Sequence, residues 1–271
     1  GITSSMSYLK IFDASVKLIT KELKDIDTKK NEYNTSIAQT KKIKNLSKGK
    51  YICLNNVSFN YKDNPKYILK NINFDFSEGS KIVLTGKTGS GKSTLFNLML
   101  GLLTPNEGEI FFRDKSIFSN LSHWREQICY ISQNIYLLDN TIKNNITYNL
   151  FDEKIDETRL QQAIQIADLN NKINNLSDGL NTRIGNDGVK LSGGEKQRIA
   201  IARALYKNAN IFFMDEFTSA LDSNTESKII KNILNAHPSK TMFMISHRES
   251  TLKNCDIILK LQNGELINEK N

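Results

Sequence analysis

Short apolar runs alternate with helical patterns along most of this 271-residue chain. Runs of four or five apolar or β-branched residues predict buried strands at 82–85, 211–214 and 241–245. Helical spacing of apolar residues predicts helices at 92–99, 199–205 and about 225–234. Because strands that alternate with helices are typical of α/β proteins, we expect an α/β core.

Shorter strand-like segments lie outside this alternation. They carry aromatic or alternating apolar residues and cover 51–61, 72–76, 109–112, 127–132, 257–261 and 265–267. The first two are predicted to be antiparallel strands around a turn at Asn64-Pro65. The last two flank Asn263-Gly264, the strongest short signal for a β-hairpin.

Residues 140–180 differ from these strands. They contain many asparagines, and apolar residues recur at helical spacing from Leu160 to Leu169. The helical character ends at the stretch Leu191-Ser192-Gly193-Gly194-Glu195, after which another helix begins. We interpret the region from about 134 to 205 as a small α-helical subdomain inserted in the α/β core.

The first 48 residues differ from the rest of the chain. Apolar residues recur at helical spacing from Met6 to Ile26, which predicts an amphipathic helix. Residues 27–50 are rich in Lys, Asn, Thr and Ser, which predicts a polar linker. We therefore expect an N-terminal segment at 1–48 and a globular domain at 49–271.

The charge of the chain limits the kinds of partner that are expected. The formal net charge is +8, and one cluster of basic residues comprises Lys29, Lys30, Lys41, Lys42, Lys44, Lys48 and Lys50. Such a run usually lies on a solvated surface. The more specific alternative is that it lies near acidic lipid headgroups. Nucleic acid is disfavoured as a partner because aromatic residues are not interleaved with these lysines.

Other features place limits on the setting of the protein. Cys53, Cys129 and Cys255 lack metal-ligand spacing and are odd in number, which fits a reducing compartment. No apolar run approaches the roughly 18–20 residues that a membrane span needs. The chain begins with Gly1 and shows no signal sequence, so we expect a fragment of a longer protein.

The strongest candidate for chemistry is the glycine-rich stretch after the strand predicted at 82–85. Gly86, four residues and then Gly91-Lys92-Ser93 have the spacing of a P-loop, in which backbone N–H groups at a helix N-terminus wrap phosphates. Lys92 adds a charge for the terminal phosphates, and the Ser93 hydroxyl can coordinate Mg²⁺. The predicted nucleotide-binding residues of this loop are Gly86, Lys87, Thr88, Gly89, Ser90, Gly91, Lys92, Ser93 and Thr94.

Two adjacent carboxylates, Asp215 and Glu216, follow the strand predicted at 211–214. Carboxylates at the end of a buried strand cost free energy of folding, so their presence there indicates a function. In a P-loop fold, Asp215 is expected to hold Mg²⁺ through water. Glu216 is then the candidate general base for the attacking water. A solvated acidic turn is the alternative interpretation.

Together these motifs resemble the nucleotide-binding domains of ATP-binding cassette (ABC) transporters. Besides the P-loop, the resemblance rests on an ordered set comprising Gln133, Leu191–Glu195, Ile211–Glu216, Ser219–Asp222 and His247. It covers about residues 51–270. It implies a P-loop NTPase (RecA-like) core, an antiparallel β subdomain and the inserted α-helical subdomain. It also implies binding of ATP with Mg²⁺.

The resemblance implies roles for individual residues. Tyr61 matches the aromatic residue that stacks on adenine, and His247 matches the histidine that contacts the γ-phosphate. Gln133 matches the residue that ligates Mg²⁺ and links the site to the membrane partner. The implied metal ligands are Ser93, Gln133 and Asp215. The implied catalytic residues are Glu216, His247 and Lys92.

The resemblance also implies a dimer. The signature motif consists of Leu191, Ser192, Gly193, Gly194 and Glu195, and in this family it closes over ATP held by a second subunit. Its position at a helix N-terminus is a ready anion site. We therefore expect a head-to-tail homodimer or a paired cassette, with Ser219 and Asp222 at the same interface.

Two positions depart from the family pattern. Phe217 stands where a small residue is usual, which leaves the packing beside the candidate base open. Asn186, in Gly185-Asn186-Asp187-Gly188, stands where exporter-type domains commonly carry glutamate, which leaves coupling to the membrane partner open. Neither change removes a catalytic group, so a competent ATPase site is expected.

The type of transporter follows from two further likenesses. Residues 138–146 look like the corresponding stretch of exporter-type domains. The helix predicted at 6–26 would be about 30 Å long and resembles the cytoplasmic end of the last transmembrane helix of such exporters. These likenesses imply the C-terminal part of a half-transporter, at the cytoplasmic face of the cell (inner) membrane, with its transmembrane domain in the same polypeptide.

The leading hypothesis is an ATP-hydrolysing motor that powers export or flipping of a lipid-linked saccharide, lipid, peptide or other solute. A soluble ABC ATPase that acts on nucleic acid or ribosomes would usually show long coiled-coil insertions or two cassettes. A nucleotide-gated module without hydrolysis is disfavoured by Glu216. The identity of the substrate is not encoded in this part of the chain.

Overall fold

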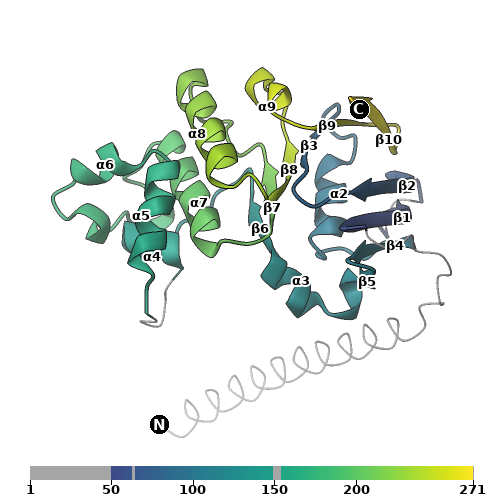
Figure 1. The fold of residues 1–271 in the computed structure, drawn as a ribbon, viewed down its shortest axis with the longest axis horizontal. Coiled ribbons are helices and arrows are strands. Elements are labelled where there is room, and N and C mark those ends of the chain that lie inside the picture. Colours follow the sequence, from purple (N-terminus) through teal and green to yellow (C-terminus); the bar gives the residue numbers. More distant parts are fainter. Residues whose placement is uncertain (1–49, 63–64, 149–153, 271) are drawn as a thin grey trace, which may run out of the picture. The chain divides into compact units, whose positions relative to one another are not determined.

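The structure is a computed structural model that describes residues 50–62, 65–148 and 154–270. The helix predicted at 6–26 and nearly all of the predicted linker lie outside the described residues. The described part contains two β-sheets and the helices that pack on them, which is the α/β fold expected (Figure 1). None of its helices is long and apolar enough to cross a bilayer.

The central sheet has six strands in the order β10-β9-β3-β8-β7-β6. Their bounds are β3 Lys81–Thr85, β6 Ile128–Ile131, β7 Ile211–Asp215, β8 Thr241–Ile245, β9 Ile257–Gln262 and β10 Glu265–Lys270. All neighbours are parallel except β9 and β10. The three apolar runs predicted as strands are β3, β7 and β8, which are adjacent and almost wholly buried, as expected for parallel strands covered on both faces.

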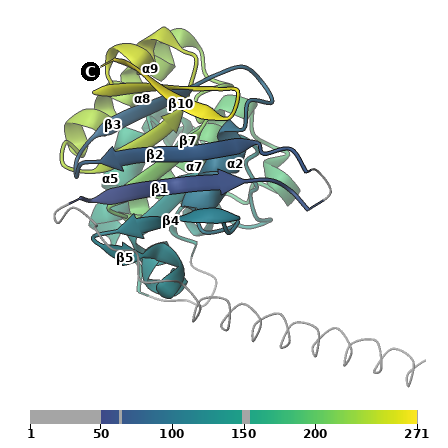
Figure 2. The same ribbon diagram turned by 90° about the vertical axis from the view of Figure 1, so that its right-hand side faces the viewer.

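A second, antiparallel sheet has the order β2-β1-β4-β5 (Figure 2). Its strands are β1 Ile52–Phe59, β2 Leu69–Phe76, β4 Glu107–Phe112 and β5 Lys115–Ser116. The antiparallel pairing of β1 with β2 confirms the prediction for the first two strand-like segments. The C-terminal hairpin is also confirmed, because Gln262 pairs with Glu265, and Asn263 and Gly264 have φ of 54° and 85°.

Eight α-helices lie in the described part of the chain. They are α2 Lys92–Met99, α3 Leu121–Gln127, α4 Ile142–Thr147, α5 Glu157–Ile166, α6 Asn170–Asn174, α7 Gly193–Lys207, α8 Ser223–Ala236 and α9 Glu249–Lys253. Helices α4 to α6 account for the helical pattern predicted between 140 and 180. Helices α3 and α9 were not predicted; with seven and five residues they are too short for a periodic pattern.

Alternate residues of the central strands enter two separate cores, because side chains of a strand point to opposite faces. On one face, Ile82 and Leu84 pack with α2 and the antiparallel sheet. On the other face, Val83 joins a cluster with residues of α5, α7 and α8. In Figure 1, α2 and α7 accordingly lie on opposite sides of the central sheet.

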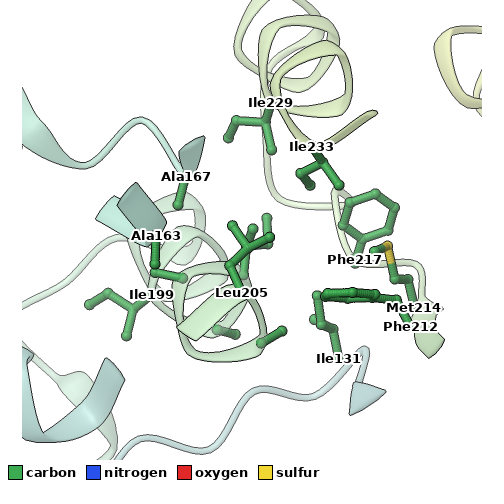
Figure 3. Close-up of a cluster of buried hydrophobic side chains, with 14 of the residues drawn as sticks. Ile131, Ala163, Ala167, Ile199, Leu205, Phe212, Met214, Phe217, Ile229 and Ile233 are labelled. Carbon is green, nitrogen blue, oxygen red and sulfur yellow. The ribbon is translucent and has the colours of Figure 1, made fainter. Parts of the chain in front are cut away.

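Phe217 belongs to the second core. Its side chain is 2% exposed and lies in the same cluster as Phe212, Met214 and Ile233 (Figure 3). The unusual phenylalanine therefore fills the hydrophobic core between the sheet and α8. The three cysteines are buried and free.

Candidate functional site

The predicted site residues meet at one edge of the central sheet. Gly86 follows β3, Gln133 comes soon after β6, Glu216 follows β7 and His247 comes soon after β8. These four strands are parallel members of one sheet, so their carboxyl ends lie at the same edge. Open α/β sheets bind ligands at this edge.

The loop between β3 and α2 has the backbone that a phosphate cradle needs. Gly86, Gly89 and Gly91 have φ of 144°, 79° and 104°, a region that glycine adopts readily and other residues rarely do. A Cβ on Gly86 would lie 2.6 Å from the Leu261 carbonyl oxygen, and one on Gly91 would lie 2.8 Å from Cγ2 of Ile68. At Gly89 nothing lies within 4 Å of that position, so the middle of the loop faces open space.

The N-terminus of α2 is prepared for an anion. Gly91 caps the helix without a side-chain hydrogen bond, so no capping side chain occupies its first N–H groups. The Ser90 Oγ atom is buried and has no hydrogen-bond partner. The Lys92 ammonium donates to the carbonyl oxygens of Gly86 at 2.6 Å and Lys87 at 3.1 Å, which keeps its charge at the loop. Uncapped N–H groups, the helix dipole and this ammonium together favour phosphate.

Ligand pockets usually have volumes of about 300–1,000 Å³. The hollow beside this loop has a volume of ≈ 760 Å³. Its lining residues include four lysines, Lys66, Lys70, Lys87 and Lys260, and residues Thr88 to Ser90. A basic lining next to the loop matches the charge of a polyphosphate.

Tyr61 lies against the first turn of α2. Its hydroxyl is 3.3 Å from Oγ1 of Thr94, and its ring packs edge-on against Phe59 at a centroid distance of 5.0 Å. The residue is 41% exposed. An aromatic ring that is held in place and still partly exposed offers a surface on which a base can stack.

The two adjacent carboxylates have different environments. Asp215 is buried at the end of β7; burial and the neighbouring Glu216 charge raise the pKa of its carboxyl, against the effect of Lys92. Glu216 has φ of 46°, a left-handed conformation that costs energy outside glycine. Its N–H donates to the Ile245 carbonyl at 3.1 Å, and its Oε2 accepts from Nε2 of Gln133 at 2.7 Å. A strained but well-supported turn thus aims Glu216 toward Gln133.

The donor set of this edge fits Mg²⁺. Ser93 supplies a hydroxyl, Asp215 a carboxylate and Gln133 an amide oxygen, since the amide nitrogen is used by Glu216. Hard cations prefer such oxygen ligands. Within the described ranges, no group of three or more His, Cys, Asp or Glu side chains could hold a metal ion. Water molecules and phosphate oxygens would complete the coordination of a cation here, as they do when Mg²⁺ binds with nucleotides.

His247 completes this edge. It lies two residues after β8, and its side chain is exposed. The backbone after it is fixed, because the Arg248 N–H donates to Oγ of Ser246 at 3.1 Å. The histidine is thus presented from a rigid turn rather than from a long loop.

The signature residues Leu191–Glu195 surround the N-terminus of α7. Ser192 and Glu195 form a capping box, in which each side chain accepts from the other's backbone N–H. Burial disfavours the Glu195 carboxylate, but Lys172 at 2.9 Å and the Ser192 N–H hold its pKa below the ordinary value. Ser192 and Gly193 are exposed.

The two signature glycines approach a loop of their own chain. A Cβ on Gly193 would lie 3.4 Å from the Ala220 Cβ, and one on Gly194 would lie 3.2 Å from the Ala220 carbonyl oxygen. Ala220 belongs to residues 218–222, which we call the 218–222 loop. In that loop, Ser219 accepts from Nε2 of Gln197 at 2.9 Å. Asp222 caps α8 by accepting from two backbone N–H groups, which lower its pKa.

Three residues of this region carry contacts that sequence reasoning did not assign. They are Gln197, Glu226 and Arg248, and all three contact the 218–222 loop. The sequence signal for them was weak: Arg248 directly follows His247, Gln197 lies two residues after the signature motif, and Glu226 is an ordinary acid in the first turn of a helix.

The departure at Asn186 lies in a 3₁₀ turn, Asn186–Gly188. The next residue, Asp187, has φ of 50°, and its carboxylate lies 3.8 Å from the Lys196 ammonium of α7. An acidic group is therefore present one position later, next to the signature helix.

A glycine cradle on an uncapped helix, together with an Asp-Glu pair at the same edge of the sheet after β7, defines a P-loop ATPase. The ABC transporter family matches residues 69–219, more than half of the chain. The chain belongs to this family, and its described part is the family's nucleotide-binding domain.

Two of the similar proteins are named as flippases, one as part of a transport system and one as an exporter. An ATP-dependent lipid A-core flippase of Aliivibrio fischeri is 37% identical over 92% of this chain, and one of Cupriavidus metallidurans is 38% identical over 79%. The glutathione/L-cysteine transport system ATP-binding/permease protein CydC of Haemophilus influenzae is 35% identical over 82%. A solved structure of a bacterial Atm1-family ABC exporter with ATP bound matches 82% of this chain at 34% identity, with a TM-score of 0.75. The chain spans only 36–42% of the length of these proteins.

Proposed function

We propose that this chain is the ATP-hydrolysing motor domain of a membrane transporter that exports or flips its substrate. The observation that carries the proposal is the meeting of Lys92, Gln133, Glu216 and His247 at one edge of one sheet. A phosphate grip, a candidate base and a candidate γ-phosphate contact are then available to one nucleotide. The similarity to ATP-dependent flippases supports the same activity.

In this proposal Glu216 is the general base. Its Oε2 accepts from Gln133, which fixes the carboxylate and leaves Oε1 to take a proton from water. The water oxygen then bonds to the γ-phosphorus as the bond to the β-phosphate oxygen breaks, and ADP and phosphate leave. Lys92, the loop N–H groups and His247 stabilise the charge on the transferred group.

Nucleotide binding uses the remaining predicted residues. Tyr61 stacks on the base, and the loop from Gly86 to Thr94 wraps the phosphates. Mg²⁺, when bound with ATP, neutralises phosphate charge. The oxygen atoms of Ser93 and Gln133 would hold the ion directly, and the Asp215 carboxylate would hold it through water.

The working unit is a head-to-tail dimer, either a homodimer or a paired cassette. Ser192 and Gly193 lie exposed at the N-terminus of α7, where an anion is favoured. We assign this surface to ATP bound by the partner subunit. Ser219 and Asp222 then lie at the same interface.

The membrane partner docks beside Gln133. A groove of ≈ 500 Å³, lined by β6, the segment after it, α4, α5 and α7, is bordered by Tyr130, Tyr136 and Tyr148, which are 41%, 62% and 52% exposed. The guanidinium of Arg203 lies 5.0 Å from the ring centre of Tyr148. Exposed tyrosines with arginine are enriched at protein interfaces. The segment Ser132–Tyr136 joins this groove to the site, which gives the partner a route to the nucleotide.

The transmembrane domain belongs to the same polypeptide in this proposal, which places the protein at the cytoplasmic face of the cell membrane. The match to the Aliivibrio flippase covers 92% of the chain and so extends into its first 49 residues. This supports a continuous connection between the N-terminal segment and the cassette. Relatives named for lipid A-core and for glutathione or cysteine share this domain at 35–38% identity, so substrate choice lies elsewhere.

Sedimentation of the Glu216→Gln chain with and without Mg·ATP tests the composite site. We expect an ATP-dependent dimer that Ser192→Arg, added to the same variant, abolishes. A monomer under both conditions contradicts the cross-subunit assignment. For hydrolysis, wild-type turnover should exceed that of Lys92→Ala; equal turnover would favour a nucleotide-gated module that does not hydrolyse.

A further inference from the structure

A buried polar network beside the candidate site has no role in the proposed hydrolysis. Glu226, in the first turn of α8, is 2% exposed. Its carboxylate accepts from Oγ1 of Thr218 at 3.1 Å, from Oγ of Ser250 at 2.9 Å and from Nη1 of Arg248 at 2.5 Å. A buried carboxylate is tolerated when it is paired and hydrogen-bonded in this way.

Arg248 extends this network to the 218–222 loop. Its Nη1 also donates to the Leu221 carbonyl at 3.2 Å, and its Nη2 donates to the Ser219 carbonyl at 2.9 Å. The planar guanidinium thus donates hydrogen bonds to the carboxylate of α8 and to two carbonyls of the loop at the same time. Since Arg248 directly follows His247, the loop is tied to the candidate γ-phosphate contact.

Gln197 holds the same loop from another side. This side chain is 3% exposed and lies on α7, three residues after the second signature glycine. Its Nε2 donates to Oγ of Ser219 at 2.9 Å, and its Oε1 accepts from the Ala220 N–H at 2.9 Å. The close approach of Gly194 to Ala220 adds a direct backbone contact. The loop is therefore tied to the signature end of α7.

We infer that Gln197 and Arg248 are positioning residues that join the signature end of α7, the 218–222 loop and the His247 turn into one mechanical unit. This inference rests on the proposed function, in which the signature serves the partner's ATP and His247 serves the chain's own ATP. The unit then links the two ATP sites of the dimer. A shift at one site is passed to the other through the loop.

Two variants separate this linkage from folding. Arg248→Lys keeps a positive charge beside Glu226 but loses the planar fork that reaches two carbonyls. Gln197→Met keeps the length of the side chain and removes its donor and acceptor. Gln197→Glu retains oxygens that can accept from the Ala220 N–H and from the Ser219 hydroxyl. Arg113→Lys is the control, because Arg113 pairs with Glu78 at an exposed site on the antiparallel sheet.

The experiment measures the ATP dependence of turnover and the binding of a fluorescent ATP analogue by each variant of the 271-residue chain. We expect a Hill coefficient that falls from about 2 toward about 1 in Arg248→Lys and Gln197→Met. Turnover should fall about ten- to hundredfold, as for displaced positioning groups. Affinity for the analogue should stay within about twofold, because neither side chain touches the loop from Gly86 to Thr94. Gln197→Glu should recover part of the loss, and Arg113→Lys should match wild type.

Each contrary outcome has a distinct meaning. Wild-type turnover and cooperativity in Gln197→Met overturn the inference, even where Arg248→Lys proves unstable. Loss of analogue affinity equal to the loss of turnover also overturns it. Hydrolysis without cooperativity in the wild type contradicts the inference alone, whereas a wild type without turnover contradicts the proposed function.

Discussion

Replacement of Phe217 with alanine should destabilise the folded domain strongly while sparing the nucleotide site. Phe217 directly follows Glu216, yet its side chain is 2% exposed in the core that contains Phe212, Met214 and Ile233 (Figure 3). Its role is therefore to fill the space between the sheet and α8. The candidate base is held by separate contacts, from Gln133 and from the backbone.

The size of the effect follows from the burial. Deletion of a fully buried phenylalanine side chain costs about 3–5 kcal/mol in the free energy of unfolding. An aromatic side chain buries about 150–250 Å². At about 25 cal/mol per Å², that area is worth about 4–6 kcal/mol before the methyl group of alanine is subtracted. Because whole domains are stable by about 5–15 kcal/mol, Phe217→Ala should remove about a fifth of the total or more. Phe217→Leu keeps most of the volume and should cost about 1 kcal/mol.

Urea unfolding followed by tryptophan fluorescence measures this loss. Trp124 is the single tryptophan of the chain and is 1% exposed, so its emission reports unfolding. Circular dichroism must give the same transition for the two-state analysis to hold. A loss below about 1 kcal/mol for Phe217→Ala, or equal losses for the alanine and leucine variants, would refute the core role. Loss of ATP-analogue binding in a variant that remains folded would refute the separation of packing from the site.

Two other groups give predictions from their environment. Burial raises the pKa of the Cys53 and Cys129 thiols to about 12, with Asp75 adding to the effect at Cys53. Neither thiol should therefore react with iodoacetamide at about pH 8 until urea unfolds the chain. Rapid alkylation of either thiol in the folded protein would contradict this prediction. Burial and Lys240 lower the pKa of His237 from 6.5, so the unfolded chain binds its proton more tightly. Its contribution to stability is complete above about pH 6.5 and is lost as the pH falls through the lowered pKa. His237→Asn should therefore show a smaller fall in melting temperature between about pH 7.5 and about pH 5.5, and an unchanged slope would exclude this histidine as a cause.

Much of the fold was predictable because its main elements carry local signals. Strands β3, β7 and β8 are short apolar runs buried on both faces, and the Asn263-Gly264 hairpin has turn chemistry of its own. Helix α3 was missed because its burial depends on one residue, Trp124, whose indole N–H donates to the Met99 carbonyl at 2.9 Å. A seven-residue helix with one fully buried side chain produces no periodic pattern.

Residues of the candidate site were likewise predictable only where they carry a local signal. The P-loop and the Asp-Glu pair were found because each is contiguous and its residue types are uncommon in that position. Glu226, Gln197 and Arg248 were not assigned a role, because each is ordinary where it stands: an acid in the first turn of a helix, for example, is favoured by the helix dipole. Their connection exists only through contacts between segments that are distant in sequence.

The signature glycines show how one local feature can serve two purposes. Sequence analysis assigned the signature motif to ATP held by a second subunit, and the structure places Ala220 of the same chain next to both glycines. The two interpretations are compatible, because the capping box uses the N–H of Glu195 and leaves the N–H groups of Gly193 and Gly194 without a capping side chain. The missing side chains let the 218–222 loop approach the helix, while the uncapped N–H groups stay available for an anion at its end. These two glycines can therefore contact the 218–222 loop and, under the proposed function, the partner's phosphate at the same time.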